Sequence, residues 1–127
     1  MKYLTAIAGA LLGLMFLIAA SLYFLGVGPK PNPPAGSATA LFLGALVPTG
    51  YFTVVKILEI VGGVLVALPP TRRLGLLILG PIIVNILLFH LLIAKGEGIA
   101  NALPVAVLAL FLVWAERRAF AAYLRGG

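Results

Sequence analysis

Residues 50–68 read GYFTVVKILEIVGGVLVAL, an apolar stretch about as long as a membrane-spanning helix, with Lys56 and Glu59 near its middle. A charged side chain at the centre of a bilayer costs roughly 2.5–3.5 kcal/mol on insertion scales. Such residues usually face the protein interior, pair with one another and mark a function. Because the two charges are three residues apart, a helix brings them to neighbouring positions on one face. We expect an ion pair that is either purely structural or part of a ligand or proton site.

The composition is that of an integral membrane protein. Of the 127 residues, 63% are hydrophobic and only 9% are charged, against about 25% charged residues in an ordinary soluble domain. At about 20 residues for each crossing, the chain has room for four helices in one domain. The absence of cysteine excludes disulfides, iron–sulfur clusters and thiolate metal sites. A single histidine forms neither a metal site nor a bis-histidine haem site, so we expect no metal and no haem.

The apolar runs and the breaks between them predict an all-α, four-transmembrane-helix bundle that spans residues 1–127 as a single domain. A proline-rich loop, GVGPKPNPPAG over 26–36, follows the first helix, and Ser37 can cap a short helix after it. That short helix cannot span the bilayer, so it is either re-entrant or interfacial. The expected spans are residues 4–25, 50–68, 74–94 and 99–119, and the short helix covers 38–47.

The distribution of Lys and Arg predicts the orientation, because cytoplasmic loops carry an excess of these residues. One side of the expected bundle holds Lys2, Arg72, Arg73, Arg117, Arg118 and Arg125, and the other holds Lys30 and Lys95. We therefore expect a multi-pass protein of the plasma membrane with both termini cytoplasmic. Basic residues at the ends of apolar runs are topology signals and do not indicate nucleic acid binding.

The polar residues of the second and third expected spans fall at similar depths. At 1.5 Å per residue, Glu59 and Asn85 lie near the midplane, Lys56 lies about 4–5 Å further out, and His90 and Tyr51 about 9 Å further out. These five residues form a candidate polar centre that opens toward the outer face. Asn85 and His90 are about 140° apart around a regular helix, however, so one helix does not aim both at one point.

Each of these residues also has a structural interpretation. Asn85 can donate to backbone groups freed by Pro81, His90 can make a hydrogen bond between helices, and Tyr51 can belong to an interfacial aromatic belt. Gly9 and Gly13 form a G-x-x-x-G pattern in the first expected helix, which indicates either ordinary packing within the bundle or a dimer face.

The chain resembles the DoxX family of small four-helix bacterial and archaeal membrane proteins. The resemblance rests on GYF over 50–52, on KILEIVGG over 56–63 and on PIIVNILLFH over 81–90. It extends over most of the chain, is strongest over 43–90 and includes the proline-rich first loop. The resemblance implies a small subunit associated with a membrane oxidoreductase, such as a thiosulfate:quinone oxidoreductase, or a component of an oxidative-stress complex.

Three functions remain open from the sequence. The first is an accessory or ligand-binding subunit that holds a quinone or another lipophilic molecule between the helices over 50–68 and 74–94, with Lys56, Tyr51, Asn85 and His90 as donors. The second is a small transporter or proton-conducting unit that uses Glu59. The third is a ligand-free scaffold. Partners would be the lipid bilayer, a second copy of the chain or a membrane oxidoreductase. The sequence contains no cofactor motif and no nucleophile with a nearby base, so an independent enzyme is the least supported function.

Overall fold

The computed structural model describes residues 2–27 and 32–126, and over these ranges the chain is helical and contains no strand. The loop lysine expected on the outer side, Lys30, lies outside the described residues. A 3₁₀ turn, Pro69–Thr71, precedes α4, and a π-helical turn, Phe89–Ile93, follows it. The six α-helices are α1 (Lys2–Leu25), α2 (Ala38–Leu46), α3 (Tyr51–Ala67), α4 (Arg72–Leu88), α5 (Ile99–Ala115) and α6 (Arg117–Leu124).

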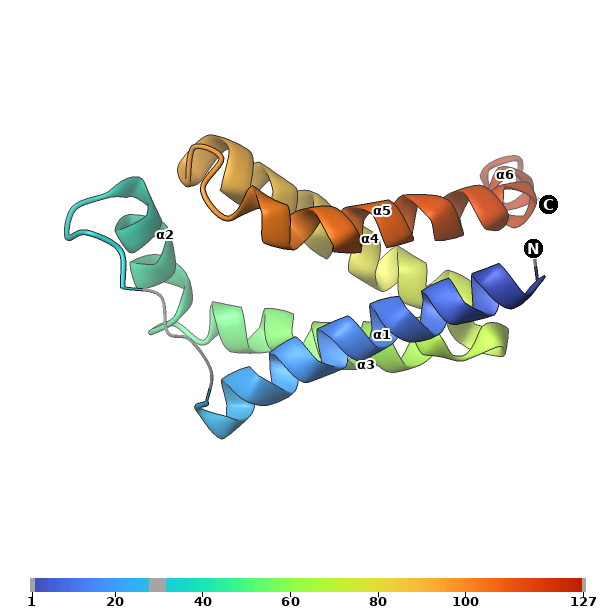
Figure 1. Cartoon of the computed structure of the whole chain (residues 1–127), viewed down its shortest axis with the longest axis horizontal. Helices are drawn as coiled ribbons and strands as arrows, with labels where there is room; N and C mark the ends of the chain where they lie inside the picture. Colours follow the sequence, from blue (N-terminus) through green and yellow to red (C-terminus); the bar gives the residue numbers. More distant parts are fainter. Residues whose placement is uncertain (1, 28–31, 127) are drawn as a thin grey trace.

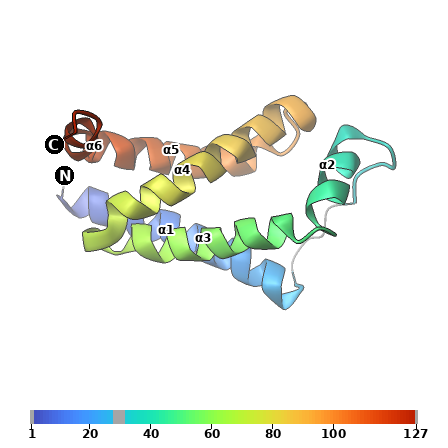
Figure 2. The ribbon, with the colours of Figure 1, turned by 180° about the vertical axis from the view of Figure 1, so that it is seen from behind.

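The four long helices form a closed arrangement in which each packs against two neighbours. α3 packs against α1 and α4, and α5 packs against the same two helices. Figures 1 and 2 show both termini at one end of the molecule, next to α6, and α2 at the opposite end. The described chain therefore runs back and forth along one axis.

One boundary prediction is wrong. The helix expected over 99–119 ends at Ala115, and α6 leaves it with a bend of 68°. Glu116 has a non-helical backbone (φ −99°, ψ 13°), and Arg117 donates from Nη1 to the carbonyl of Trp114 over 2.8 Å. The arginine side chain thus satisfies a carbonyl left free at the helix end, which stabilises the break.

The first helix and the segment from Pro69 to Ile93 are each long and apolar enough to cross a membrane. Two bent pairs, α2 with α3 and α5 with α6, pass the same test jointly, so the described chain has two to four candidate spans. Their outward faces expose large apolar side chains, among them Leu110 (70%) and Val107 (62%). Such extensive apolar exposure is unusual for a soluble monomer and typical of a surface that contacts lipid. The protein is a membrane protein.

The core is small and consists of side chains from all four long helices. Its largest fully buried side chains are Leu12 of α1, Val66 of α3, Leu79 of α4 and Leu112 of α5. Because lipid is as apolar as these side chains, close van der Waals packing holds such helices together in place of a hydrophobic driving force.

Glycines allow α1 to approach α3 closely. A Cβ on Gly13 would collide with the carbonyl oxygen of Gly63, and a Cβ on Gly9 would lie 2.6 Å from Nε of Arg72. Both Gly9 and Gly13 are buried by residues of the same chain. Packing within the bundle, one of the two interpretations of the G-x-x-x-G pattern, therefore accounts for both glycines.

The short helix α2 begins as predicted, with Oγ of Ser37 accepting a hydrogen bond from the backbone N–H of Ala40 over 3.2 Å. It meets α3 at an angle of 78°. Gly50 makes this turn with φ +81°, a left-handed conformation that side-chain-bearing residues rarely adopt. α2 is thus directed away from the axis of α3 and covers the end of the molecule.

Candidate functional site

Lys56 and Glu59 form the ion pair that the sequence predicts. Nζ of Lys56 lies 3.3 Å from Oε1 of Glu59, and their side chains are 16% and 5% exposed. Both belong to α3, whose regular helical geometry brings residues three apart onto neighbouring positions. Glu59 is therefore enclosed, whereas Lys56 keeps part of its surface free.

Two aromatic rings lie near the ammonium group of Lys56. Nζ lies 5.0 Å from the centroid of the Phe52 ring and 5.9 Å from that of Tyr23. The two rings meet edge to face at 5.3 Å, and the Tyr23 hydroxyl is hydrogen-bonded to Oγ1 of Thr53 at 3.0 Å. Attraction between the ammonium and these ring faces offsets part of the free-energy cost of removing the charge from water. The lysine is thus fixed by one carboxylate and two rings.

Lys56 borders an open cleft of about 1070 Å³, which we call the Lys56 cleft. Lys56 is the one charged residue among its described lining residues, and Tyr23 and Thr53 are the lining residues that carry hydroxyls. The cleft lies between the end of α1, α2 and the start of α3. Its lining comprises Ala19, Leu22, Tyr23, Phe24, Gly26, Val27, Pro33, Ala40, Leu43, Gly44, Val47, Pro48, Phe52, Thr53 and Lys56.

The Lys56 cleft has the chemistry of a site for a lipophilic ligand with an oxygen acceptor. Its volume is at the upper end of the roughly 300–1,000 Å³ typical of small-molecule sites, and its wall is mostly apolar with a few polar groups. An ammonium has three N–H donors, and the contact with Glu59 uses one of them. The remaining donors of Lys56 are available to a carbonyl oxygen in the cleft.

The other three residues of the predicted polar centre are not among the described residues that line this cleft. Tyr51 is 63% exposed at the first turn of α3. Asn85 is exposed on α4 and makes no side-chain hydrogen bond to the described residues. The structure therefore brings Lys56 and Glu59 together and leaves Tyr51 and Asn85 pointing outward.

His90 has a local structural contact. Its Nδ1 donates to the carbonyl oxygen of Glu97 over 2.9 Å, because a carbonyl can only accept. Gly98, in the same turn, has φ +75°, and a Cβ there would lie 3.2 Å from Cε1 of the histidine. His90 thus ties the π-helical turn after α4 to the turn before α5, which is a local bond and not the hydrogen bond between helices that the sequence suggested. Phe89, beside it, contacts Phe42 of α2 with ring centroids 5.2 Å apart.

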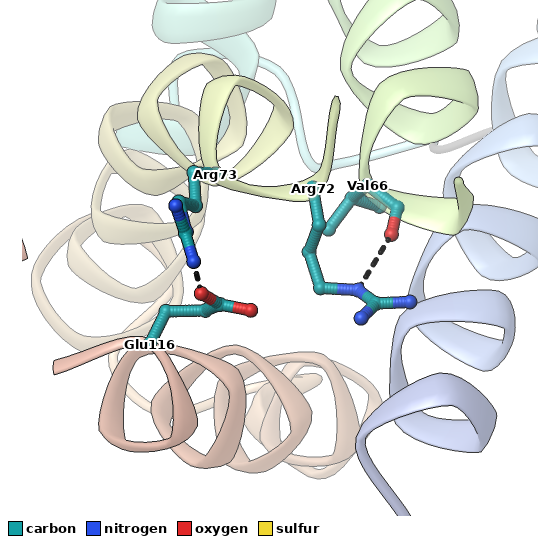
Figure 3. A network of polar contacts seen from close by, with 4 residues as sticks. All are labelled: Val66, Arg72, Arg73 and Glu116. Atoms are coloured by element: carbon teal, nitrogen blue, oxygen red, sulfur yellow. Dashed lines mark hydrogen bonds and ion pairs between the residues drawn. The ribbon is translucent and has the colours of Figure 1, made fainter. Parts of the chain in front are cut away.

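Sequence reasoning took Arg72 and Arg73 only as topology signals and missed their contacts inside the protein (Figure 3). Nε of Arg72 donates to the carbonyl oxygen of Val66 over 3.2 Å, and the residue is only 5% exposed. Nε of Arg73 lies 2.6 Å from Oε2 of Glu116. The two arginines therefore link the start of α4 to the ends of α3 and α5. The sequence contained one signal for the pairing of Arg73: the chain has only three acidic residues, so few partners are available to each arginine.

No group of three or more His, Asp or Glu side chains that could hold a metal ion occurs in residues 2–27 and 32–126. Comparisons of the chain with protein-family models, with curated proteins and with solved structures gave no match.

Proposed function

We propose that this protein is a small DoxX-like membrane subunit that binds a quinone or a similar lipophilic molecule in the Lys56 cleft and associates with a membrane oxidoreductase. The sequence suggested a ligand between the helices over 50–68 and 74–94. We now place the ligand between α1, α2 and α3, because the cleft beside Lys56 lies there. Tyr23 and Thr53 take the place of Tyr51, Asn85 and His90 as the polar neighbours of Lys56.

The observation that carries this proposal is a lysine with free donors at the wall of an apolar cleft. A quinone presents carbonyl oxygens on a flat apolar ring and requires donors in an otherwise apolar slot. Phe52 and Tyr23 offer ring faces and edges to such a ligand at the same place where Lys56 offers its N–H groups. Glu59 holds the ammonium in position.

In this proposal α1, α3, α4 and α5 all cross the bilayer, with both termini cytoplasmic and the Lys56 cleft near the outer side. The closed packing of the four helices supports this, and so does the common end of the two termini in Figure 1. The described end with the termini carries most of the basic residues, as the positive-inside rule requires of a cytoplasmic side. α2 would then lie at the outer surface over the cleft.

Association with a partner oxidoreductase rests on the resemblance and on the size of the chain. The described residues include no group recognisable as a complete catalytic centre. A bound quinone would therefore serve a redox centre in another protein. The transporter alternative has less support, because Glu59 is enclosed by its pairing with Lys56 and is not among the described lining residues of the cleft.

Purification in mild detergent tests the proposal. We expect an organic extract of the purified protein to contain quinone, detected by mass spectrometry, and we expect added decylubiquinone to raise the melting temperature. The control is the same extraction from an unrelated four-helix membrane protein prepared in parallel from the same cells. Recovery of bulk phospholipid alone, together with an unchanged melting temperature, would refute the proposal.

A further inference from the structure

The end of the molecule opposite the Lys56 cleft contains a second, smaller groove of about 370 Å³. It lies between the first turns of α4 and the helix α6. Leu77 of α4 and Phe120 and Tyr123 of α6 are its large apolar lining residues, and Arg73 is its charged one. The groove thus combines an apolar wall with one guanidinium.

Arg73 is held in place but keeps binding capacity. Its Nε contacts Oε2 of Glu116 at 2.6 Å, whereas 65% of its side chain is exposed. Figure 3 shows the guanidinium of Arg73 turned toward Glu116, away from Arg72. No hydrogen bond within the described residues uses the two terminal nitrogens of Arg73. A guanidinium whose remaining donors are free can bind a phosphate oxygen.

The helix α6 separates charge from apolar surface. Arg117 and Arg118 begin the helix, and Arg125 follows its last residue. Phe120 and Tyr123 line the groove, and Leu124 is 84% exposed. An amphipathic helix bent by 68° from a spanning helix has the features of a helix that lies in the membrane interface.

The positive net charge of this end of the molecule favours a negatively charged partner. The cations there are Lys2, Arg72, Arg73, Arg117, Arg118 and Arg125, and Glu116 is the acidic residue among them. A basic site beside an apolar groove at one end of a membrane protein is complementary to the headgroup and acyl chain of an anionic phospholipid.

We propose that the groove between α4 and α6 binds one anionic phospholipid, with the phosphate at the terminal nitrogens of Arg73 and an acyl chain along Leu77 and Phe120. The site is independent of the Lys56 cleft and does not rest on the quinone proposal. Glu116 orients Arg73 through Nε and leaves its two terminal nitrogens to the lipid.

The test uses Trp114, the single tryptophan of the chain, which is 50% exposed and precedes Glu116 by two residues. The full-length protein is reconstituted in vesicles that contain brominated phosphatidylglycerol or brominated phosphatidylcholine, and quenching of Trp114 fluorescence gives relative lipid affinities. We expect phosphatidylglycerol to bind about fivefold more tightly than phosphatidylcholine, the effect of one well-placed basic residue. Equal quenching by the two lipids in the wild-type protein would overturn the proposal.

Substitutions test whether Arg73 causes the preference for phosphatidylglycerol over phosphatidylcholine. R73Q should bring the affinity ratio near one, whereas E116Q, which also breaks the ion pair but keeps the guanidinium, should retain or increase it. K95Q, at the other end of the molecule, is the matched charge control and should leave the ratio unchanged. Should R73Q fail to fold, A122F fills the groove from an exposed position and should abolish the preference. Retention of the full preference in R73Q or, where R73Q does not fold, in A122F would refute the site, and so would its loss in K95Q.

Discussion

We expect replacement of Lys56 by methionine to lower the free energy of unfolding by about 3–5 kcal/mol, because it leaves the Glu59 carboxylate enclosed without its partner. Replacement of Glu59 by glutamine should cost less, about 1–2 kcal/mol, because a glutamine oxygen still accepts a hydrogen bond from Lys56. Glu59 is the more buried of the two, with 5% of its side chain exposed against 16% for Lys56. The group that K56M leaves without a partner is therefore the one further from water, which is why K56M should be the more destabilising substitution. Unfolding in detergent, followed by circular dichroism, measures each value.

The double variant K56M/E59L tests whether Lys56 and Glu59 are energetically coupled. Replacing both members of a buried ion pair by apolar residues of similar volume is often neutral or stabilising. We therefore expect the double variant to regain most of the stability that K56M loses, and to lose the response to quinone. If the two single effects simply add in the double variant, Lys56 and Glu59 are not energetically coupled and the pairing argument fails.

The second large effect is expected from filling the Lys56 cleft. Gly44 of α2 lines the cleft, and a Cβ built on it meets no atom within 4 Å. G44W should therefore place an indole in the cleft with little change in melting temperature, and should weaken the binding of decylubiquinone at least about tenfold, a difference of about 1.4 kcal/mol.

The matched control for this variant is G80W. Gly80 of α4 also has no atom within 4 Å of an added Cβ, and it does not belong to the lining of the Lys56 cleft. We expect G80W to bind decylubiquinone as the wild-type protein does. Equal binding by G44W and the wild type would exclude the cleft as the quinone site, whatever the stability of either variant.

Much of the fold follows from the apolar periodicity and the loop residues. The positions of the long helices, the Ser37 cap and the contact of Lys56 with Glu59 agree with the sequence because each depends on local spacing. The break after Ala115 was missed, because residues 105–125 contain no glycine or proline that would mark a helix end. One contact at the break, Arg73 with Glu116, joins residues 43 apart and arises only in the folded chain, whereas the hydrogen bond from Arg117 to the carbonyl of Trp114 is local.

The candidate site was only half predictable for a similar reason. Depth along a helix follows from counting residues, so Asn85 and Glu59 could be assigned a similar height. Direction around the helix depends on which neighbours pack there, and Asn85 is exposed. The cleft itself depends on the 78° turn at Gly50, which directs α2 away from α3 and leaves Lys56 at the wall of the resulting space. The sequence alone sets no value for that angle.

Photoaffinity labelling with an azidoquinone tests the central proposal, the location of the ligand, most directly. The purified wild-type protein is irradiated with the probe, and the labelled residues are identified by peptide mass spectrometry, with excess decylubiquinone as competitor. We predict competed labelling at the lining of the Lys56 cleft, in the segments around Tyr23, Gly44 and Phe52. Competed labelling confined to the segment of α4 around Asn85 and His90, with none in the cleft, would contradict it.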